Sequence, residues 1–199
     1  MMAVSTPPPL NRAERRKQHT REAIKRAALE LLLHDGYAAL SVQAITARAD
    51  IGYGTFYLHF EDKDDAIWAA MVDNSERLQV EIDAQLADMP YPRREFMSWV
   101  LFFDYMHQTR AVFIDVFGSH GSAKLQHNFF RYTAELHERH LKAATYSAGL
   151  DLPPEFLAQF IAGALVRLLM WWLENPSAYT SRQMAEMMFI AVFRQPPPL

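Results

Sequence analysis

The sequence predicts an all-α fold, and three observations support this prediction. Apolar residues recur every three or four positions in successive segments of the chain, which is the spacing of one face of an α-helix. No segment shows the apolar and polar alternation that a half-buried strand requires. Glycine is scarce, at 7 of 199 residues, while half of the residues are hydrophobic, and this balance suits packed helices.

Two helical segments are predicted near the N-terminus. The first carries five apolar residues at helical spacing, namely Ile24, Ala27, Ala28, Leu31 and Leu32. Gly36 follows as a typical helix stop. Ser41 is a natural N-cap for the second segment, which is short because residues 50–52 interrupt it.

Another short helix is predicted from Tyr53 to Phe60, so residues 41–60 form two short helices joined by a tight turn. Phe56 and Phe60 are four residues apart and can face the same core. The remaining surface of this helix carries hydroxyl and imidazole groups and no acidic side chain, on Tyr53, Gly54, Thr55, Tyr57 and His59. Such groups suit contact with a polyanion, because each can donate a hydrogen bond to a phosphate or to a base edge.

A long helix is predicted from Asp62 to about Ala87, where prolines at 90 and 92 follow it. Further helices are expected at about 93–108, 110–118, 122–148, 154–174 and 181–194. The segment from Phe156 to Leu173 is apolar on nearly every face, which indicates burial on two sides. Its longest charge-free stretch, residues 156–166, is shorter than the ~20 residues of a membrane span. We therefore expect contact with a second subunit and no membrane partner.

Charge is distributed unevenly along the chain. The net charge is −3, yet residues 1–34 carry seven basic and three acidic side chains, a local net charge of +4. Phosphate contact requires local positive charge, so this end is a candidate for nucleic-acid binding, with a solvated basic tail as the alternative. We expect residues 1–17 to form a flexible, basic and proline-rich arm, and residues 196–199 a loose tail.

Several classes of function find no support in the sequence. The chain has no cysteine, which excludes disulfides and thiolate sites and fits a reducing compartment. The first ten residues lack the apolar region of a signal peptide, so we expect a cytoplasmic protein. No glycine-rich phosphate loop, nucleophile elbow or zinc-protease motif occurs, so we expect no enzyme and no cofactor. His137 and His140 could share a metal ion, but the charged residues between them indicate a solvated face, and we expect no metal site.

Residues 41–63 resemble the N-terminal signature of the tetracycline-repressor (TetR) family of transcriptional regulators. The segment Gly54-Thr-Phe-Tyr-Leu-His-Phe60 and Lys63 carry the resemblance, which extends over roughly residues 20–75. Asp50 departs from the family pattern, which usually has Gly there, and Gly52 stands where a capping residue is frequent. Asp tolerates a left-handed backbone better than most residues, and Gly weakens a cap only modestly.

The resemblance implies a three-helix DNA-binding domain over residues 18–78, with a helix-turn-helix at 41–60. A long helix would join it to a helical ligand-binding and dimerisation domain over residues 79–195. The resemblance also implies a homodimer that represses transcription from a palindromic double-stranded operator and is released by a small-molecule effector. The family roles assign phosphate contacts to Ser41, Arg48, Tyr57, His59 and Lys63. They assign base contacts to Gln43, Tyr53, Gly54 and Thr55.

Two further sites are expected in the second domain. Its aromatic side chains would suit an apolar or aromatic ligand, although ordinary helix-bundle core is the alternative. The pocket candidates are Trp99, Phe102, Phe103, Met106, Phe113, Phe117, Phe130 and Met170. The candidates for the dimer interface are Leu157, Ile161, Ala164, Leu165, Leu168 and Trp172. A helical enzyme or a purely structural interaction protein is the alternative function, but neither explains residues 41–63.

Overall fold

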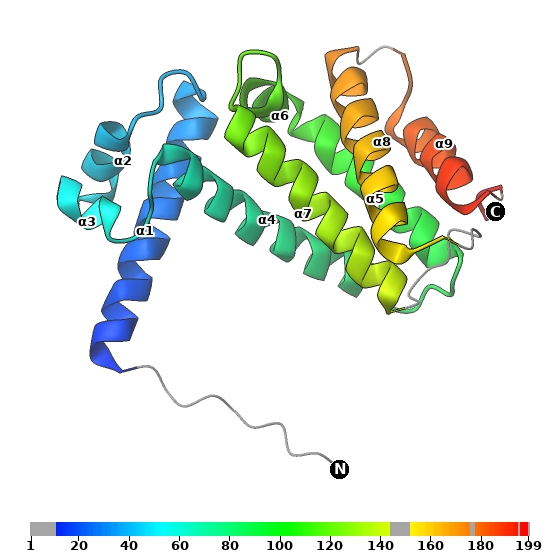
Figure 1. Cartoon of the computed structure of the whole chain (residues 1–199), viewed down its shortest axis with the longest axis horizontal. Coiled ribbons are helices and arrows are strands. Elements are labelled where there is room, and N and C mark those ends of the chain that lie inside the picture. The colour runs from blue at the N-terminus through cyan, green and yellow to red at the C-terminus, as the bar shows by residue number, and fades with distance from the viewer. Residues whose placement is uncertain (1–10, 144–151, 176–177, 195, 199) are drawn as a thin grey trace. The chain divides into compact units, whose positions relative to one another are not determined.

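The computed structural model describes residues 11–143, 152–175, 178–194 and 196–198. Within these ranges the chain forms α-helices and no β-strand, which confirms the all-α prediction (Figure 1). The helices are α1 (Arg12–Asp35), α2 (Val42–Ala49), α3 (Tyr53–Tyr57), α4 (Lys63–Gln85), α5 (Arg93–Gln108), α6 (Arg110–Phe117), α7 (Ala123–Lys142), α8 (Pro154–Glu174) and α9 (Ser181–Phe193). The predicted bounds of the helices at 93–108, 110–118, 154–174 and 181–194 are met to within one residue. The helix predicted over 122–148 ends at Lys142, and residues 144–148 lie outside the described residues.

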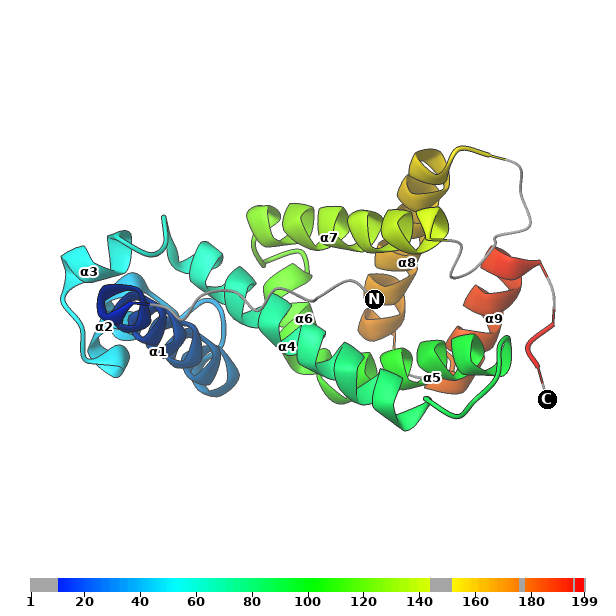
Figure 2. The same cartoon turned by 90° about the horizontal axis from the view of Figure 1, so that it is seen from below.

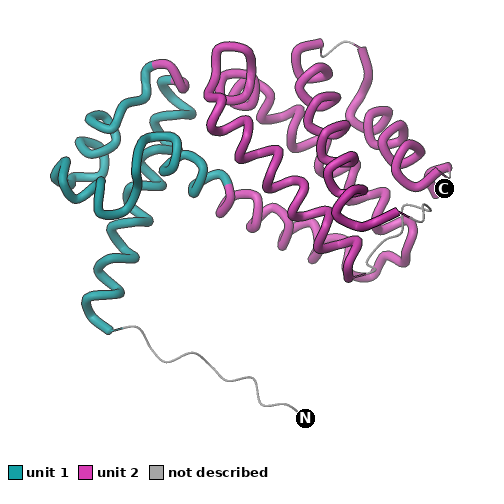
Figure 3. Tube along the Cα trace, in the orientation of Figure 1, with its two compact units in different colours: residues 1–35, 39–71 teal, residues 36–38, 72–199 magenta. Residues whose placement is uncertain are grey.

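The helices divide into two compact units (Figure 3). Unit 1 comprises residues 1–35 and 39–71, and unit 2 comprises residues 36–38 and 72–199. The boundary therefore falls within α4 after Met71, and not at residue 78 as predicted. The segment 36–38 belongs to unit 2, where the Tyr37 N–H donates to the Asp115 carboxylate of α6.

Helix α1 begins at Arg12, so the prediction of a flexible arm is wrong for residues 12–17. A capping box explains the early start: the Asn11 N–H donates to Glu14 Oε2 at 2.8 Å, and the Glu14 N–H donates to Asn11 Oδ1 at 2.9 Å. These reciprocal bonds satisfy donors that the beginning of a helix otherwise leaves open. Residues 1–10 lie outside the described residues, and residues 196–198 follow α9 without helical structure.

Unit 1 is built on one apolar core that α1, α2, α3 and the first turns of α4 share. All five apolar residues predicted on the first helix are buried. Ile45 of α2, Phe56 of α3 and Ile67 of α4 are also almost completely removed from solvent, and α2 packs against both α1 and α3. Because α2 and α3 are too short to be stable alone, this packing holds them in place. Figure 2 shows both short helices beside α1.

The turn between α2 and α3 keeps its geometry despite the two unusual residues. Asp50 adopts the left-handed conformation, with φ 52° and ψ 51°, and ends α2. Gly52 precedes α3 as its N-cap without a side-chain hydrogen bond. At the other end of α2, Ser41 Oγ accepts from the Ala44 N–H at 3.2 Å, which confirms Ser41 as the N-cap.

Unit 2 is a helical bundle. Helix α7 packs along α8, α5 packs against α9, and α6 contacts both α7 and α8. The interior is rich in aromatic side chains, including Phe96, Phe103, Trp172 and Phe189, which are almost completely buried. The indole N–H of Trp172 donates to the Tyr179 carbonyl at 2.7 Å and so fixes the connection between α8 and α9.

One histidine lies in the core of unit 2. His137 is 7% exposed, and its ring stacks on that of Trp99 with centroids 6.0 Å apart. The prediction of a solvated face is therefore wrong for His137. Burial is the main cause that lowers its pKa from 6.5 to about 4, and the positive charge of His140 adds to it. Within the described ranges, no three His, Asp or Glu side chains are grouped so that they could hold a metal ion.

We predict that acidification destabilises the fold through His137. Because its pKa is lower in the folded than in the unfolded chain, the unfolded chain binds the proton more tightly. The contribution of His137 to the free energy of unfolding should be fully present above about pH 6.5. It should fall by about 3 kcal/mol as the pH decreases toward about 4. Urea unfolding at several pH values would measure this loss.

The matched variant is His137→Phe, which keeps an aromatic ring against Trp99 and removes the titrating group. It should lose clearly less stability than the native chain over the same pH range. Equal losses in the two proteins would show that other groups cause the acid sensitivity.

Candidate nucleic-acid interface

One side of α3 is fixed to the core of unit 1. Phe56 is fully buried, and its ring contacts Phe60 with centroids 6.0 Å apart, as expected for two core residues. The ring of Tyr57 packs edge-on against Phe56 at 5.4 Å. Because Phe56 is buried and α3 packs against α2, the outer side of the short helix is presented to solvent in a defined position.

The outer side of α3 carries a pair of exposed tyrosines. Tyr53 is 55% and Tyr57 is 50% exposed, and their rings meet edge to face at 5.4 Å. The Tyr57 hydroxyl donates to that of Tyr53 at 3.5 Å, and this bond is the main cause that raises the pKa of Tyr57. The Tyr57 phenol therefore remains a protonated donor at neutral pH. Between them, Gly54 has open space where a Cβ would stand.

The predicted contact residues of α2 are also accessible. Gln43 and Arg48 are exposed, and so is Ser41, whose hydroxyl can donate while its oxygen caps the helix. Arg48 Nη1 lies 3.4 Å from Glu30 Oε2 of α1, in a pair that is about half exposed on each side. Exposed ion pairs are weak, so this guanidinium can exchange the carboxylate for a phosphate at little cost.

Lys63 has a structural contact that the sequence does not reveal. Its Nζ donates to the Leu40 carbonyl at 2.9 Å. This bond ties the beginning of α4 to the segment that leads into α2. Lys63 therefore positions the interface within unit 1, whatever further contact its charge makes.

His59 is half-buried and lines a cleft against α1. Its backbone carbonyl accepts from Arg21 Nη1 at 2.8 Å. Its ring Nδ1 is buried and has no hydrogen-bond partner within the described part of the chain. Burial, followed by the charges of Lys17 and Arg21, lowers the pKa of His59 below 6.5, so the ring is neutral at neutral pH.

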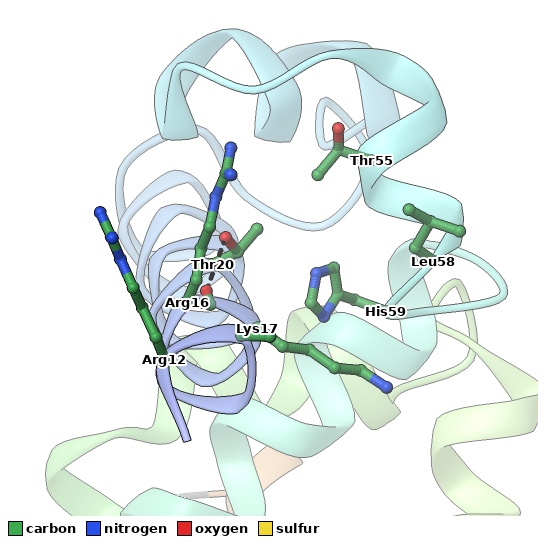
Figure 4. A pocket seen from close by; sticks show the side chains of 8 residues that line it. Arg12, Arg16, Lys17, Thr20, Thr55, Leu58 and His59 are labelled. Carbon is green, nitrogen blue, oxygen red and sulfur yellow. Dashed lines mark hydrogen bonds between the residues drawn. The ribbon is translucent and has the colours of Figure 1, made fainter. Parts of the chain in front are cut away.

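The cleft beside His59 is an open groove of about 1030 Å³. Its lining comes from α1 and from the α3 region, namely Arg12, Ala13, Arg16, Lys17, Thr20, Thr55, Leu58 and His59 (Figure 4). Sequence reasoning missed the α1 residues because the proline-rich start suggested a flexible arm. Two signals could have found them: the Asn11-x-x-Glu14 capping pattern, and the four-residue spacing of Arg12, Arg16 and Thr20.

The predicted pocket residues, here called the aromatic cluster, all belong to unit 2, where their ring contacts fall into two groups, one on α5 and one on α6. Six of them are buried, and Phe102 and Phe130 are half-buried. Phe103 contacts Trp99 and Phe102, while Phe113 contacts Phe117 on α6.

Glu95 adds a polar group to the edge of this cluster. Its carboxylate accepts from the Trp99 indole N–H at 3.2 Å, and burial is the main cause that raises its pKa. Glu95 could not be identified from the sequence, because a single acidic residue in an amphipathic helix carries no signal of burial.

The predicted dimer interface needs a correction. Leu157, Ile161, Leu165 and Trp172 are buried inside their own subunit, since this side of α8 packs against the rest of unit 2, and the prediction is wrong for these four. Ala164 is half-buried and Leu168 is exposed. The exposed apolar face of α8 and α9 consists of Phe156, Phe160, Leu168, Trp171, Met187 and Ile190.

Among the described residues, α8 is also the one helix that is long and apolar enough to cross a membrane. Half of that apolar window is buried within unit 2, which is typical of a core helix of a globular protein.

Two family models match the chain. The family described as bacterial regulatory proteins, tetR family, matches residues 24–67, which include all of α2 and α3. The family described as a transcriptional regulator C-terminal region matches residues 98–194. Together the two matches cover both units.

Known proteins agree with these matches. The HTH-type transcriptional repressor KstR of Mycolicibacterium smegmatis is 32% identical over 83 residues, so the match spans 41% of each chain. The structure of FadR from Thermus thermophilus, a TetR-family repressor in complex with lauroyl-CoA, has a TM-score of 0.65 at 15% identity and covers 86% of this chain and 92% of that one. A TetR regulator from Streptococcus agalactiae has a TM-score of 0.58 at 22% identity and covers 90% and 97%. At such identities the structures show a shared fold.

Proposed function

The chain belongs to the tetR family of bacterial regulatory proteins, and we propose that it acts as a homodimeric repressor of transcription. In this proposal α2 and α3 bind a palindromic double-stranded operator, and a small-molecule effector in unit 2 releases it. The observation that carries the proposal is the exposed tyrosine pair on a helix whose other side is fixed by Phe56. Hydroxyl donors on a rigid, accessible helix suit contacts with phosphates and base edges. The match with a named repressor supports the direction of regulation.

We predict that operator selection with the intact protein enriches a palindrome and that single variants separate the two kinds of contact. Tyr57→Phe removes only a hydroxyl, so binding should weaken about 10- to 100-fold on every sequence, as expected for a lost hydrogen bond to a charged group. Gln43→Ala and Thr55→Ala should instead alter the sequence preference. Fluorescence anisotropy at constant salt concentration measures both effects.

The matched control is Tyr91→Phe, because Tyr91 is an exposed tyrosine of unit 2. It should bind like the native protein. If selection enriches no sequence, the regulator proposal is abandoned.

A homodimer accounts for the exposed apolar face of α8 and α9. Phe160 is 62% and Ile190 is 49% exposed, which is unusual for such side chains unless another surface covers them. A twofold axis would place this face against its own copy and hold two α3 helices for two half-sites.

We predict that Phe160→Glu and Ile190→Glu convert the dimer to monomers, because burying an unpaired carboxylate is strongly unfavourable. Both variants should also lose operator affinity, since two half-sites are no longer bound together. Sedimentation velocity measures the mass. Val80→Glu places the same charge on an exposed apolar position of α4 and should leave the dimer intact. Dimers of native mass for both interface variants would refute this interface.

The effector site is proposed within the aromatic cluster of unit 2, with Glu95 available for a polar group of an otherwise apolar ligand. Helix α6 links this cluster to the segment after α1. Phe113 and Phe117 belong to the cluster, and Asp115 of the same helix accepts the Tyr37 N–H. A ligand that moves α6 therefore acts on the segment that leads into the DNA-binding helices.

We predict that an effector lowers operator affinity on the order of 5- to 150-fold and that the operator lowers effector affinity by the same factor. Lauroyl-CoA, the ligand in the FadR structure, is the first probe, with laurate and coenzyme A as separate controls. Titration of each probe against free and operator-bound protein measures the coupling. A probe that binds both forms equally tightly is not an effector.

A further inference from the structure

The cleft between the first turns of α1 and the α3 region is a concentrated site of positive charge. Arg12, Arg16 and Lys17 line it, and none of the described residues in its lining is acidic. Within the described part of the chain, none of these three side chains has an ion-pair partner. Like charges four residues apart repel each other along a helix, so an anion in the cleft would relieve this repulsion.

The opposite wall supplies polar groups that continue the surface of α3. Thr55 and His59 line this wall, and Figure 4 shows them across the opening from Arg16 and Thr20. His59 Nδ1 is buried and has no partner among the described residues, so no hydrogen bond within this part of the chain uses this ring nitrogen. Leu58, 76% exposed beside the cations, offers an apolar contact that a deoxyribose ring can use.

We propose that this cleft binds the sugar–phosphate backbone of the operator next to the segment that α3 contacts, with Arg12, Arg16 and Lys17 as phosphate ligands. The inference rests on the proposed function and extends it, because it adds the beginning of α1 to the DNA-binding surface. The backbone is the preferred occupant because the cleft shares Thr55 and His59 with the α3 region. A strand whose bases contact α3 continues past these residues.

DNA binding at this cleft should also change the protonation of His59. The charged groups that face His59 from α1 are Lys17 and Arg21. Arg12 and Arg16 line the same cleft, and Thr55 and Leu58 are uncharged. A phosphate would neutralise this positive surrounding and favour the protonated imidazole. DNA binding would then take up protons, at most one per subunit.

The first test measures operator affinity of the intact dimer over about 0.05 to 0.4 M KCl. Replacing Arg12, Arg16 and Lys17 together by Ala should reduce the slope of log K against log salt by about 5, since the two subunits of the dimer each lose three phosphate ligands and each neutralised phosphate contributes about 0.9. The ratio of operator to non-specific affinity should change little, because phosphate contacts carry no sequence information. These exposed positions accept Ala in a helix, so circular dichroism should show an intact fold.

The charge-matched control replaces Arg131, Lys142 and Arg182 of unit 2, each of which lies in an exposed i,i+4 pair with a glutamate. Its salt slope should equal that of the native protein. If the α1 triple variant also keeps the native slope, the cleft does not bind the backbone. If the native protein binds no operator at all, the proposed function fails first.

The second test distinguishes DNA from a soluble anion as the occupant of the cleft. Inorganic phosphate and ADP, titrated by calorimetry, should bind no more tightly to the native protein than to the α1 triple variant. Tight binding that the triple variant loses, together with an unchanged DNA salt slope, would assign the cleft to a soluble phosphorylated ligand and overturn the proposal.

Operator affinity of the native protein should increase as the pH falls from about 8 to 6, by at most about tenfold per pH unit and subunit. His59→Gln should abolish this dependence, and His19→Gln, at an exposed histidine of α1, should keep it. An equal pH dependence in native protein and His59→Gln would remove His59 from the site.

Discussion

The burial of Phe56 is the interaction on which the candidate DNA-binding surface depends. Helix α3 has five residues, fewer than a helix needs to be stable in water by itself. Full burial of a phenylalanine contributes about 1.5–3 kcal/mol, and contacts with Phe60 and Tyr57 add directional packing. Because the same turn of helix exposes Tyr53 and Tyr57, the packing of one side determines where the other side presents its hydroxyl groups.

The polar contacts of unit 1 complete this constraint by fixing the ends of the short helices. Ser41 caps α2, Asp50 ends it in a left-handed conformation, and Lys63 joins the first turn of α4 to the Leu40 carbonyl. The beginning of α4 is therefore part of unit 1, while its last turns belong to unit 2. Two connections therefore run from unit 2 to α2 and α3: the continuous helix α4, and the chain segment after Tyr37, which a hydrogen bond holds to Asp115 of α6.

The sequence predicted what local patterns determine and failed where tertiary contacts decide. Proline, glycine and capping residues marked most helix ends, and the spacing of Phe56 and Phe60 identified the core side of α3. The inner side of α8 could not be predicted, because a helix that is apolar on all sides has no polar face to mark the outside. Leu157 and Phe160 are equally apolar, yet the first lies inside the subunit and the second is exposed. The burial of His137 could not be predicted for a different reason, because its neighbours in sequence are charged while its ring stacks on Trp99 from another helix.

The partners of the basic residues, more than their number, determine which of them can bind phosphate. The excess of basic residues at the N-terminal end suggested phosphate contact, yet two of these bases serve the fold itself. Lys25 is buried and lies 2.7 Å from Glu22, and Arg21 lies over the Phe60 ring while it donates to the His59 carbonyl. Arg12 and Arg16 differ, because both are exposed and line the cleft beside α3, where none of the described lining residues is a carboxylate. Affinity for phosphate depends on such uncompensated cations, so a chain with a net charge of −3 can still present a surface suited to DNA.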